Sequence, residues 1–245
     1  MKGLAEFVMR GRFQALLVTV AGSGSLMFCW ISAAVVALVI LRKGVAAGLW
    51  LVFWGLLPAG VLAYAVGDSG PLSLLLGTTA LAIVLRNTVN LPLAVLASVA
   101  VGGLTGLAMV VFAGASLEQI VTYFGEFLAS LEQQLSQGDQ QIVLARPDAT
   151  QIAGIMGVGA GMTAVLCLLL ARYWQALLYN PDGFGGEFKA LYYPPAVAAL
   201  LALLTVGLAS MGASYRTWAM ICVIPLMFAG LALVHARAEV RGQGT

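Results

Sequence analysis

The stretch ATQIAGIMGVGAGMTAVLCLLLA, residues Ala149–Ala171, decides the fold that this chain can adopt. It contains no charged residue, and a run of roughly 20 apolar residues is what an α-helix needs to cross a hydrocarbon layer. The stretch continues as RYWQALLYNPDGFGGEF (Arg172–Phe188), the densest group of polar, aromatic and turn-forming residues in the chain. We expect the helix to end at Asn180-Pro181, because proline disfavours helical geometry in the residue before it.

The rest of the chain has the composition of a membrane protein. Of its 245 residues, 61% are hydrophobic and 9% are charged, whereas about 25% are charged in a typical soluble domain. Backbone groups in lipid must be satisfied within each segment, and richness in Ala, Leu and Gly suits packed helices better than the alternating pattern of a barrel. We therefore expect an all-α polytopic membrane helical bundle, which forms a single integral membrane domain over residues 1–245.

Apolar segments divide the chain into about eight predicted membrane segments. They cover residues 13–22, 24–41, 44–66, 71–85, 91–113, 149–171, 194–211 and 217–234. The first is short, so Gly22-Ser23-Gly24 marks either a tight turn between two helices or a kink in one long helix. A kinked helix would reduce the count to seven.

Cationic residues decide between the two counts, because translocating them is costly and they favour the cytoplasmic side. With a turn at residues 22–24, one side receives most of the cations: Lys2, Arg10, Arg12, Arg42, Lys43, Arg86, Arg172, Lys189, Arg237 and Arg241. The other side receives Asp68, the connection 114–148, and only Arg146 and Arg216 as cations. This pattern favours eight segments with both termini in the cytoplasm. We expect the membrane to be a bacterial inner membrane.

The connection over residues 114–148 is the one long polar segment, and we expect it outside the cytoplasm. Apolar residues at intervals of three and four predict an amphipathic helix: Leu117, Ile120, Val121, Phe124, Phe127, Leu128, Leu131 and Leu135. Ser116 and Gln119 fit a capping box at its start, and Asp148 or Thr150 can cap the next membrane helix. We expect this helix to cover the bundle, with a lid over an outward site or a partner-binding helix as alternatives.

Polar and aromatic residues after the sixth segment form the main candidate site, a cytoplasmic recognition surface. Its members are Arg172, Tyr173, Trp174, Gln175, Tyr179, Asn180 and Glu187. An aromatic belt at the level of the lipid headgroups explains part of this composition, and Asp182 with the glycines after it predicts a turn-rich loop. The number of distinct polar side chains exceeds what anchoring requires, which indicates recognition.

A second polar cluster consists of Arg86, Asn87 and Asn90. Pro92 suits the first turn of a helix that Asn90 can cap, so the cluster fits a plain turn between membrane helices. As a functional alternative, two amides and a guanidinium at a cytoplasmic helix junction can hold a partner's carboxylate or a lipid phosphate.

Small residues recur at four-residue spacing, as in Ala33 with Ala37 and Gly44 with Gly48. In lipid, such stripes let helix backbones approach closely. They are typical of packing inside one bundle. The alternative is that a stripe near the N-terminus docks a partner membrane protein.

The sequence contains no recognisable motif for catalysis or metal binding. No Asp, Glu, Lys, Arg or His lies in the middle of an apolar segment, which argues against a proton-driven transporter or an ion pump. The sequence has no GxxxxGK[ST] or HExxH motif and no Ser/His or Cys/His pair placed for nucleophilic catalysis. Its three cysteines have no metal-ligand spacing. We expect a non-enzymatic protein that uses no cofactor and no metal and binds no nucleic acid.

The runs YWQALLYNPDGFGGEF (Tyr173–Phe188) and ALVILRKGVAAGLW (Ala37–Trp50) resemble the uncharacterised YybS-like family of bacterial integral membrane proteins. That family is distantly similar to the substrate-binding S-components of energy-coupling-factor vitamin transporters. The resemblance implies a protein that binds a vitamin or a metal and docks an ATPase module through a small-residue stripe, here Ala33 and Ala37. The amphipathic insertion and the larger number of predicted crossings depart from the usual six-helix pattern of S-components.

Two functions remain open from the sequence. The first is an S-component-like protein that binds a small molecule and works with an ATPase or coupling module; it predicts a polar-lined outward pocket roofed by residues 116–136. The second is a structural or assembly partner of another membrane complex, with Arg172–Phe188 as its cytoplasmic contact; it predicts a filled core. Substrate, partner identity and oligomeric state do not follow from these residues.

Overall fold

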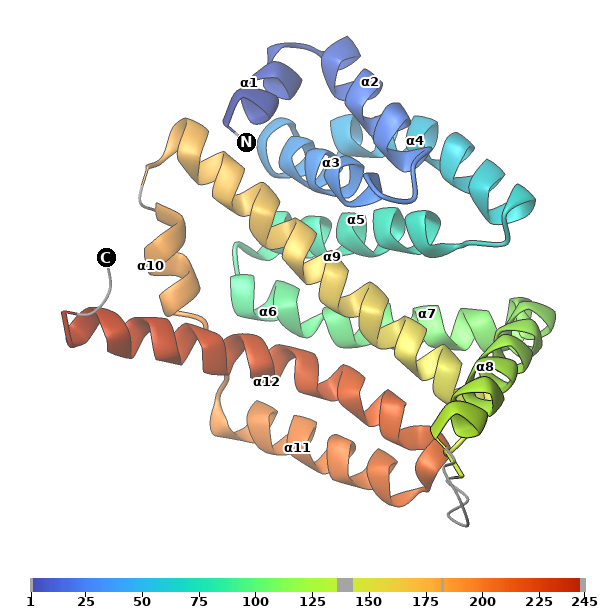
Figure 1. Cartoon of the computed structure of the whole chain (residues 1–245). Helices are drawn as coiled ribbons and strands as arrows, with labels where there is room; N and C mark the ends of the chain where they lie inside the picture. Colours follow the sequence, from blue (N-terminus) through green and yellow to red (C-terminus); the bar gives the residue numbers. More distant parts are fainter. Residues whose placement is uncertain (1, 136–142, 182, 243–245) are drawn as a thin grey trace.

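The computed structural model describes residues 2–135, 143–181 and 183–242, and all regular elements in these ranges are α-helices (Figure 1). The helices are α1 (Lys2–Arg10), α2 (Arg12–Ser23), α3 (Cys29–Lys43), α4 (Val45–Ala65), α5 (Gly70–Thr88), α6 (Leu91–Leu96), α7 (Ser98–Phe112), α8 (Gly114–Leu135), α9 (Ala149–Tyr179), α10 (Gly183–Lys189), α11 (Pro195–Ser210) and α12 (Ala213–Val240). This confirms the all-α class.

Five helical stretches are long and apolar enough to cross a membrane. They are α4, α5, the combined α6 and α7, α9 and α12. The other predicted segments form shorter helices, α2 with 12 residues, α3 with 15 and α11 with 16. The structure therefore supports a membrane protein with five candidate spans, while the predicted count of about eight is not confirmed.

The N-terminal region folds as a helical hairpin. Helix α2 ends at Ser23 and α3 begins at Cys29, and the two helices pack against each other. At the other end of the hairpin, the Lys43 ammonium donates a hydrogen bond to the Met9 carbonyl over 3.3 Å. A single kinked helix would hold these two residues far apart, so the expected turn is present, although it covers residues 24–28 and not Gly22-Ser23-Gly24.

Helix α9 is the central element and runs diagonally through the bundle in Figure 1. It packs against α3, α5, α7 and α12. Its contact with α7 depends on glycine, because a Cβ on Gly102 would lie 2.7 Å from the carbonyl oxygen of Gly157. Such close backbone approach is what small residues provide in lipid, where the hydrophobic effect does not drive helices together.

The predicted ends of α9 are confirmed. Asp148 is the N-cap, and its carboxylate accepts a hydrogen bond from the Gln151 N–H at 2.7 Å within a full capping box. The helix ends at Tyr179 with Asn180 as its C-cap. Asn90 likewise caps α6 by accepting a hydrogen bond from the Leu93 N–H. In all three cases a short local pattern in the sequence was sufficient to predict where the helix begins or ends.

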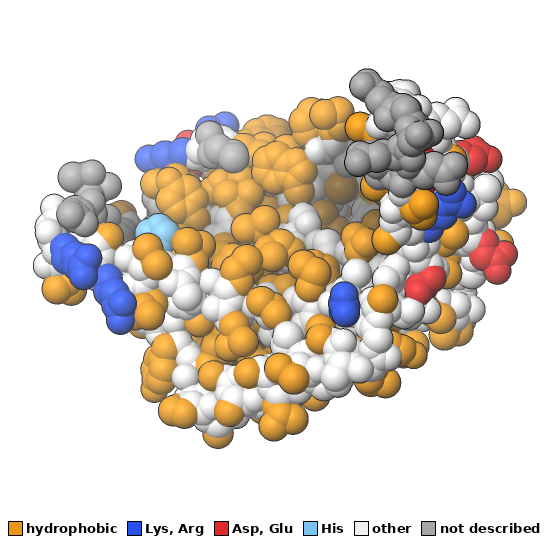
Figure 2. All heavy atoms as spheres, turned by 60° about the horizontal axis from the view of Figure 1, so that its bottom comes forward, with side chains coloured by type: hydrophobic (Ala, Val, Ile, Leu, Met, Phe, Trp, Pro, Cys, Tyr) orange, Lys and Arg blue, Asp and Glu red, His pale blue; other side chains and the backbone are white. Residues whose placement is uncertain are grey.

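Cationic side chains that are far apart in sequence lie at one end of the bundle. The Arg42 guanidinium lies 4.1 Å from the centre of the Tyr179 ring, and Lys189 pairs with Glu239 at 2.7 Å. The opposite end holds Asp148 beside Ser214. On the face shown in Figure 2, charged side chains lie mostly toward the two ends and the broad middle is hydrophobic or uncharged, as a membrane-embedded surface requires.

Two local predictions are wrong. The helix predicted from Ser116 exists as α8, but it begins at Gly114 directly after α7, and the Leu117 N–H bonds the Ala113 carbonyl, so Ser116 and Gln119 form no capping box there. The turn-rich loop predicted after Asn180 contains a short helix, α10. The polar residues 136–142 and Asp182 lie outside the described residues.

Candidate functional site

An open cavity of about 610 Å³ lies at the α8 end of the bundle. Its origin is a difference in helix length. At 1.5 Å per residue α9 is about 46 Å long, whereas α3 reaches only about 22 Å. Arg42 contacts Tyr179 at the end of α9, and the Trp30 carbonyl meets the Cys167 thiol midway along it. Helix α3 therefore covers only the second half of α9.

The lining of this cavity comes from the uncovered half of α9, from the α2–α3 and α4–α5 loops, and from parts of α5, α7 and α8. It includes Ile155, Met156, Gly159 and Thr163 of α9 and Cys29, the first residue of α3. The α4–α5 loop contributes Asp68, whose carboxylate accepts a hydrogen bond from the Gly70 N–H at 2.7 Å. Hydroxyl groups of Ser69, Ser73, Thr105 and Thr163 are the other polar groups among the lining side chains.

Helix α8 borders the same cavity with Ile120. Its Leu117 is buried against Ile152 and Ala153 of α9, with Trp218 of α12 beside them. The Trp218 indole donates a hydrogen bond to the Thr150 carbonyl at 2.9 Å. These contacts hold the first half of α8 against the bundle. Farther along, Tyr123, Phe124 and Phe127 are exposed.

At the cationic end, the two polar clusters identified in the sequence meet in one cavity of about 360 Å³. The Arg172 guanidinium pairs with the Glu187 carboxylate at 2.7 Å and donates to the Gln175 side-chain oxygen at 3.1 Å. Arg86 and Asn87 line the same cavity. The sequence assigned these residues to one membrane side, and the structure brings them together.

Arg86 also has a structural role within this cavity. Its Nη1 donates hydrogen bonds to the carbonyl oxygens of Ile40 and Leu41 at 2.9 and 2.8 Å. These carbonyls belong to the last turn of α3, where the helix dipole favours a cation. The Ile40 carbonyl also accepts the Gly44 N–H, whereas no backbone hydrogen bond to the Leu41 carbonyl from outside α3 is recorded among the described residues. Asn90 lies outside the cavity lining and serves as the cap of α6.

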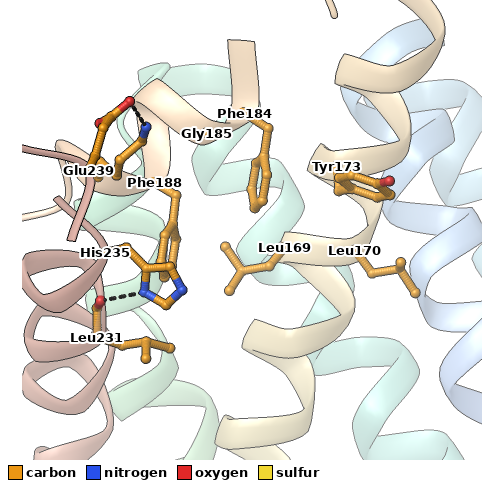
Figure 3. Close-up of a pocket in the computed structure, with 10 residues that line it drawn as sticks. Leu169, Leu170, Tyr173, Phe184, Gly185, Phe188, Leu231, His235 and Glu239 are labelled. Carbon is orange, nitrogen blue, oxygen red and sulfur yellow. Dashed lines mark hydrogen bonds and ion pairs between the residues drawn. The ribbon is translucent and has the colours of Figure 1, made fainter. Parts of the chain in front are cut away.

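A third cavity, of about 580 Å³, separates α9 from α12 beneath α10 (Figure 3). Phe184 and Phe188 point from α10 into the space between the two long helices, toward Leu169 and Leu231. The Tyr173 ring packs edge to face on Phe184, and the His235 ring does the same on Phe188. This site is aromatic and apolar, and the Lys189–Glu239 pair lies at its upper edge.

The remaining predicted recognition residues do not share one surface. Trp174 is fully buried in the core, so it cannot contact a partner directly. Tyr173 and Tyr179 are 45% and 42% exposed, and Asn180 is exposed as the C-cap of α9. The predicted surface thus separates into three parts: Arg172 with its partners Glu187 and Gln175, the aromatic cavity that Tyr173 lines, and the buried Trp174.

The small-residue stripes near the N-terminus lie within the bundle. Ala33 and Ala37 are both 0% exposed, in a helix whose middle is covered by α2, α4, α5 and α9. Gly48 is buried beside Ile40, and Gly44, with φ of +111°, forms the turn between α3 and α4. A partner helix would find Ala33 and Ala37 already covered, so this stripe packs the chain's own helices.

In the sequence, Asp68 stood out only as one of the charges on the less cationic side, and the hydroxyl groups around it were not identified. No motif marks these residues, because the cavity depends on which helices are short and where α9 lies. Among the described residues, no group of three or more His, Cys, Asp or Glu side chains is placed to hold a metal ion. Comparison of the chain with models of known protein families, with curated proteins and with solved structures found no match.

Proposed function

We propose that this chain is a non-enzymatic bacterial inner-membrane protein that binds a small molecule in the cavity at its α8 end. One observation carries the proposal: a cavity of about 610 Å³, apolar with a few polar groups, bordered by the helix expected to cover an outward site. Ligand sites are typically concave, about 300–1,000 Å³ in volume and mostly apolar, with a few polar groups that orient the ligand.

The orientation that goes with this function follows from the charges. The end with most of the cations faces the cytoplasm, because cationic residues resist translocation. Both termini then lie in the cytoplasm, and the α8 cavity opens outside. The cytoplasmic end offers Arg86, Arg172 and Glu187 to an ATPase or coupling module, in keeping with the resemblance to the YybS-like family and to S-components. Since Ala33 and Ala37 are buried, docking uses these polar residues and not the alanine stripe.

Native mass spectrometry of gently extracted protein tests the binding. Gly159 lines the cavity and has no atom within 4 Å of where a Cβ would lie, so Gly159→Phe places a ring at the cavity wall from a position with room for its Cβ. Gly103 of α7 has equally open surroundings but lies outside the cavity lining, so Gly103→Phe is the matched control. We expect a bound small molecule in the wild type and in Gly103→Phe, and its loss in Gly159→Phe.

A second candidate is an assembly role without a ligand. It is favoured by the packing of the N-terminal half, where the middle of α3 from Ser32 to Ile40 is buried against the neighbouring helices. In this case the same experiment yields no ligand mass. Instead, a membrane protein other than an ATPase copurifies and is lost in Asn180→Ala, which removes the exposed polar side chain at the end of α9.

A further inference from the structure

We infer that the cavity at the α8 end selects small organic cations, a conclusion that rests on the proposed function and names the chemical class of its ligand. The Asp68 carboxylate is the one charged side chain in the lining of this cavity. The other polar contributions are uncharged hydroxyl groups and a thiol, and the rest of the wall is apolar. A bound cation would lie near one full negative charge, whereas an anion would be repelled by it.

Asp68 has no cationic partner within 4 Å among the described residues, and its one recorded hydrogen bond joins Oδ1 to the Gly70 N–H. That contact orients the carboxylate but leaves Oδ2 available. Asp68 is itself exposed to solvent. A cation in the cavity would therefore pair with a solvated carboxylate while its apolar groups contact the wall beside it.

Most charges outside the lining at this end are also negative. Glu118 and Glu126 of α8 have no recorded cationic partner among the described residues, while Glu132 pairs with Arg146 at 3.4 Å. Acidic side chains thus outnumber arginines at this end of the described structure. A cleft bordered by charge of one sign and by apolar walls raises the local concentration of oppositely charged ligands.

Three probes of similar shape differ in charge, so they test charge alone. Choline carries a positive charge, 3,3-dimethylbutan-1-ol is its uncharged isostere, and 3,3-dimethylbutanoate carries a negative charge. Cys29 provides the site-specific reading, because it lines the cavity, whereas Cys167 and Cys222 are buried in the bundle. Each probe is titrated against the rate at which uncharged iodoacetamide alkylates Cys29, with the protein in lipid nanodiscs. Alkylation at Cys29 is quantified by peptide mass spectrometry, so partitioning of a probe into lipid is not counted as binding.

We expect choline to protect Cys29 at a concentration at least about tenfold lower than the alcohol, and the carboxylate not to protect it at that concentration. Asp68→Asn removes the charge while its amide oxygen can still accept the Gly70 N–H, so the loop conformation is retained. In this variant choline should protect no better than about twofold over the alcohol. Glu118→Gln removes one negative charge from the same end outside the lining, and should leave the preference for choline nearly unchanged.

The fold of each variant is checked by its thermal unfolding, whose midpoint should match the wild type. Because Asp68 acts electrostatically on the Cys29 thiol, protection in each variant is expressed relative to that variant's own alkylation rate without a probe. Equal protection by all three probes overturns the cation preference and leaves the proposed binding function standing. Absence of protection by any probe also overturns it, and the Gly159→Phe comparison then decides separately whether the cavity binds a molecule at all. If Glu118→Gln abolishes the preference for choline and Asp68→Asn does not, the cation is selected by α8, and the role of Asp68 is overturned.

Discussion

Arg172 of α9 and Glu187 of α10 form an ion pair with an Nη2–Oε2 distance of 2.7 Å, and both side chains are about three-quarters buried, at 22% and 24% exposed. The pair joins the end of the central helix to the short helix that follows it. On the far side of α10, Lys189 pairs with Glu239 of α12. Helix α10 is therefore held between the two longest helices by two ion pairs and by the rings of Phe184 and Phe188.

Breaking the Arg172–Glu187 pair should release α10 and leave the membrane helices inserted. Arg172→Gln strands a partly buried carboxylate, and hydrogen bonds to charged groups contribute about 1.5–3 kcal/mol. We expect limited proteolysis between Asn180 and Pro194 to become at least about tenfold faster. The double variant Arg172→Glu with Glu187→Arg should restore most of the protection. Unchanged cleavage in Arg172→Gln would show that the rings alone hold α10.

Arg86 should matter for stability far more than Asn87 beside it. Its guanidinium closes the last turn of α3 through the Ile40 and Leu41 carbonyls. We expect Arg86→Gln to lower the unfolding free energy by about 1–3 kcal/mol, because a charged donor is lost from one partly buried and one exposed acceptor. Asn87→Ala, at a position with no recorded side-chain hydrogen bond, is the control and should change it by less than about 0.5 kcal/mol. Thermal unfolding in detergent measures both, and equal effects would contradict the capping role.

The contact of α7 with α9 should not tolerate a single added methyl group. A Cβ on Gly157 would lie 2.5 Å from the Gly102 carbonyl oxygen, and backbone cannot move aside as a flexible side chain can. Overpacking of this kind costs about 1–3 kcal/mol or more, so Gly157→Ala should unfold at a clearly lower temperature. Gly103→Ala, on the same α7 but with open space around it, should be neutral or stabilising. A stable Gly157→Ala protein would contradict the close approach.

Asp148 gives the α9 N-terminus a defined acid dependence. A hydrogen bond from Ser214 and the backbone N–H of Gln151 lower the pKa of this carboxyl below its ordinary value of 3.8. A group with a depressed folded pKa contributes stability that is complete above the unfolded pKa and is lost as pH falls through the folded value. We expect Asp148→Ala to cost about 0.5–2 kcal/mol at pH 7.

This difference between wild type and Asp148→Ala should shrink below about pH 3.8 as Asp148 protonates. Unfolding curves at pH 7 and at pH 3 measure it. A difference that stays constant over this range would show that the carboxylate charge has no part in capping.

Cys29 should report which side of the membrane the α8 cavity faces. It is partly exposed, while Cys167 and Cys222 are buried. In intact cells a membrane-impermeant maleimide should label Cys29 if the cationic end is cytoplasmic, and Cys29→Ser should abolish the labelling. Labelling only after the cells are permeabilised would reverse the proposed topology.

The parts of the fold that follow from neighbouring residues could be predicted, and those that depend on distant contacts could not. Asp148, Asn90 and the stop at Asn180 act within a few residues, so their patterns were sufficient. The glycines before Phe188 indicated a loop, yet Glu187 and the two phenylalanines find partners on α9 and α12 that stabilise a helix.

The same distinction holds for the candidate sites. Arg86 and Arg172 each attracted attention in the sequence, but their shared cavity requires α5 and α9 to pack together. Ala33 and Ala37 give the same four-residue pattern whether the neighbouring helix belongs to this chain or to another. Only their burial in the structure shows that they pack helices of this chain. The cavity around Asp68 depends on how the α4–α5 loop, α7, α8 and α9 come together, which no local motif records.

The unequal lengths of α2 and α9 also make the apolar exterior of this molecule uneven. At about 18 Å, α2, whose Phe13 and Leu17 are exposed, is shorter than a hydrocarbon layer about 30 Å thick, whereas α9, with Ile155 and Leu166 exposed, is longer. In a membrane, lipids beside α2 would have to compress, and each ångström of mismatch costs a fraction of a kcal/mol. Such a bilayer would be thinner beside α2 than beside α9, and a neighbour with an equally short apolar surface would relieve the deformation there.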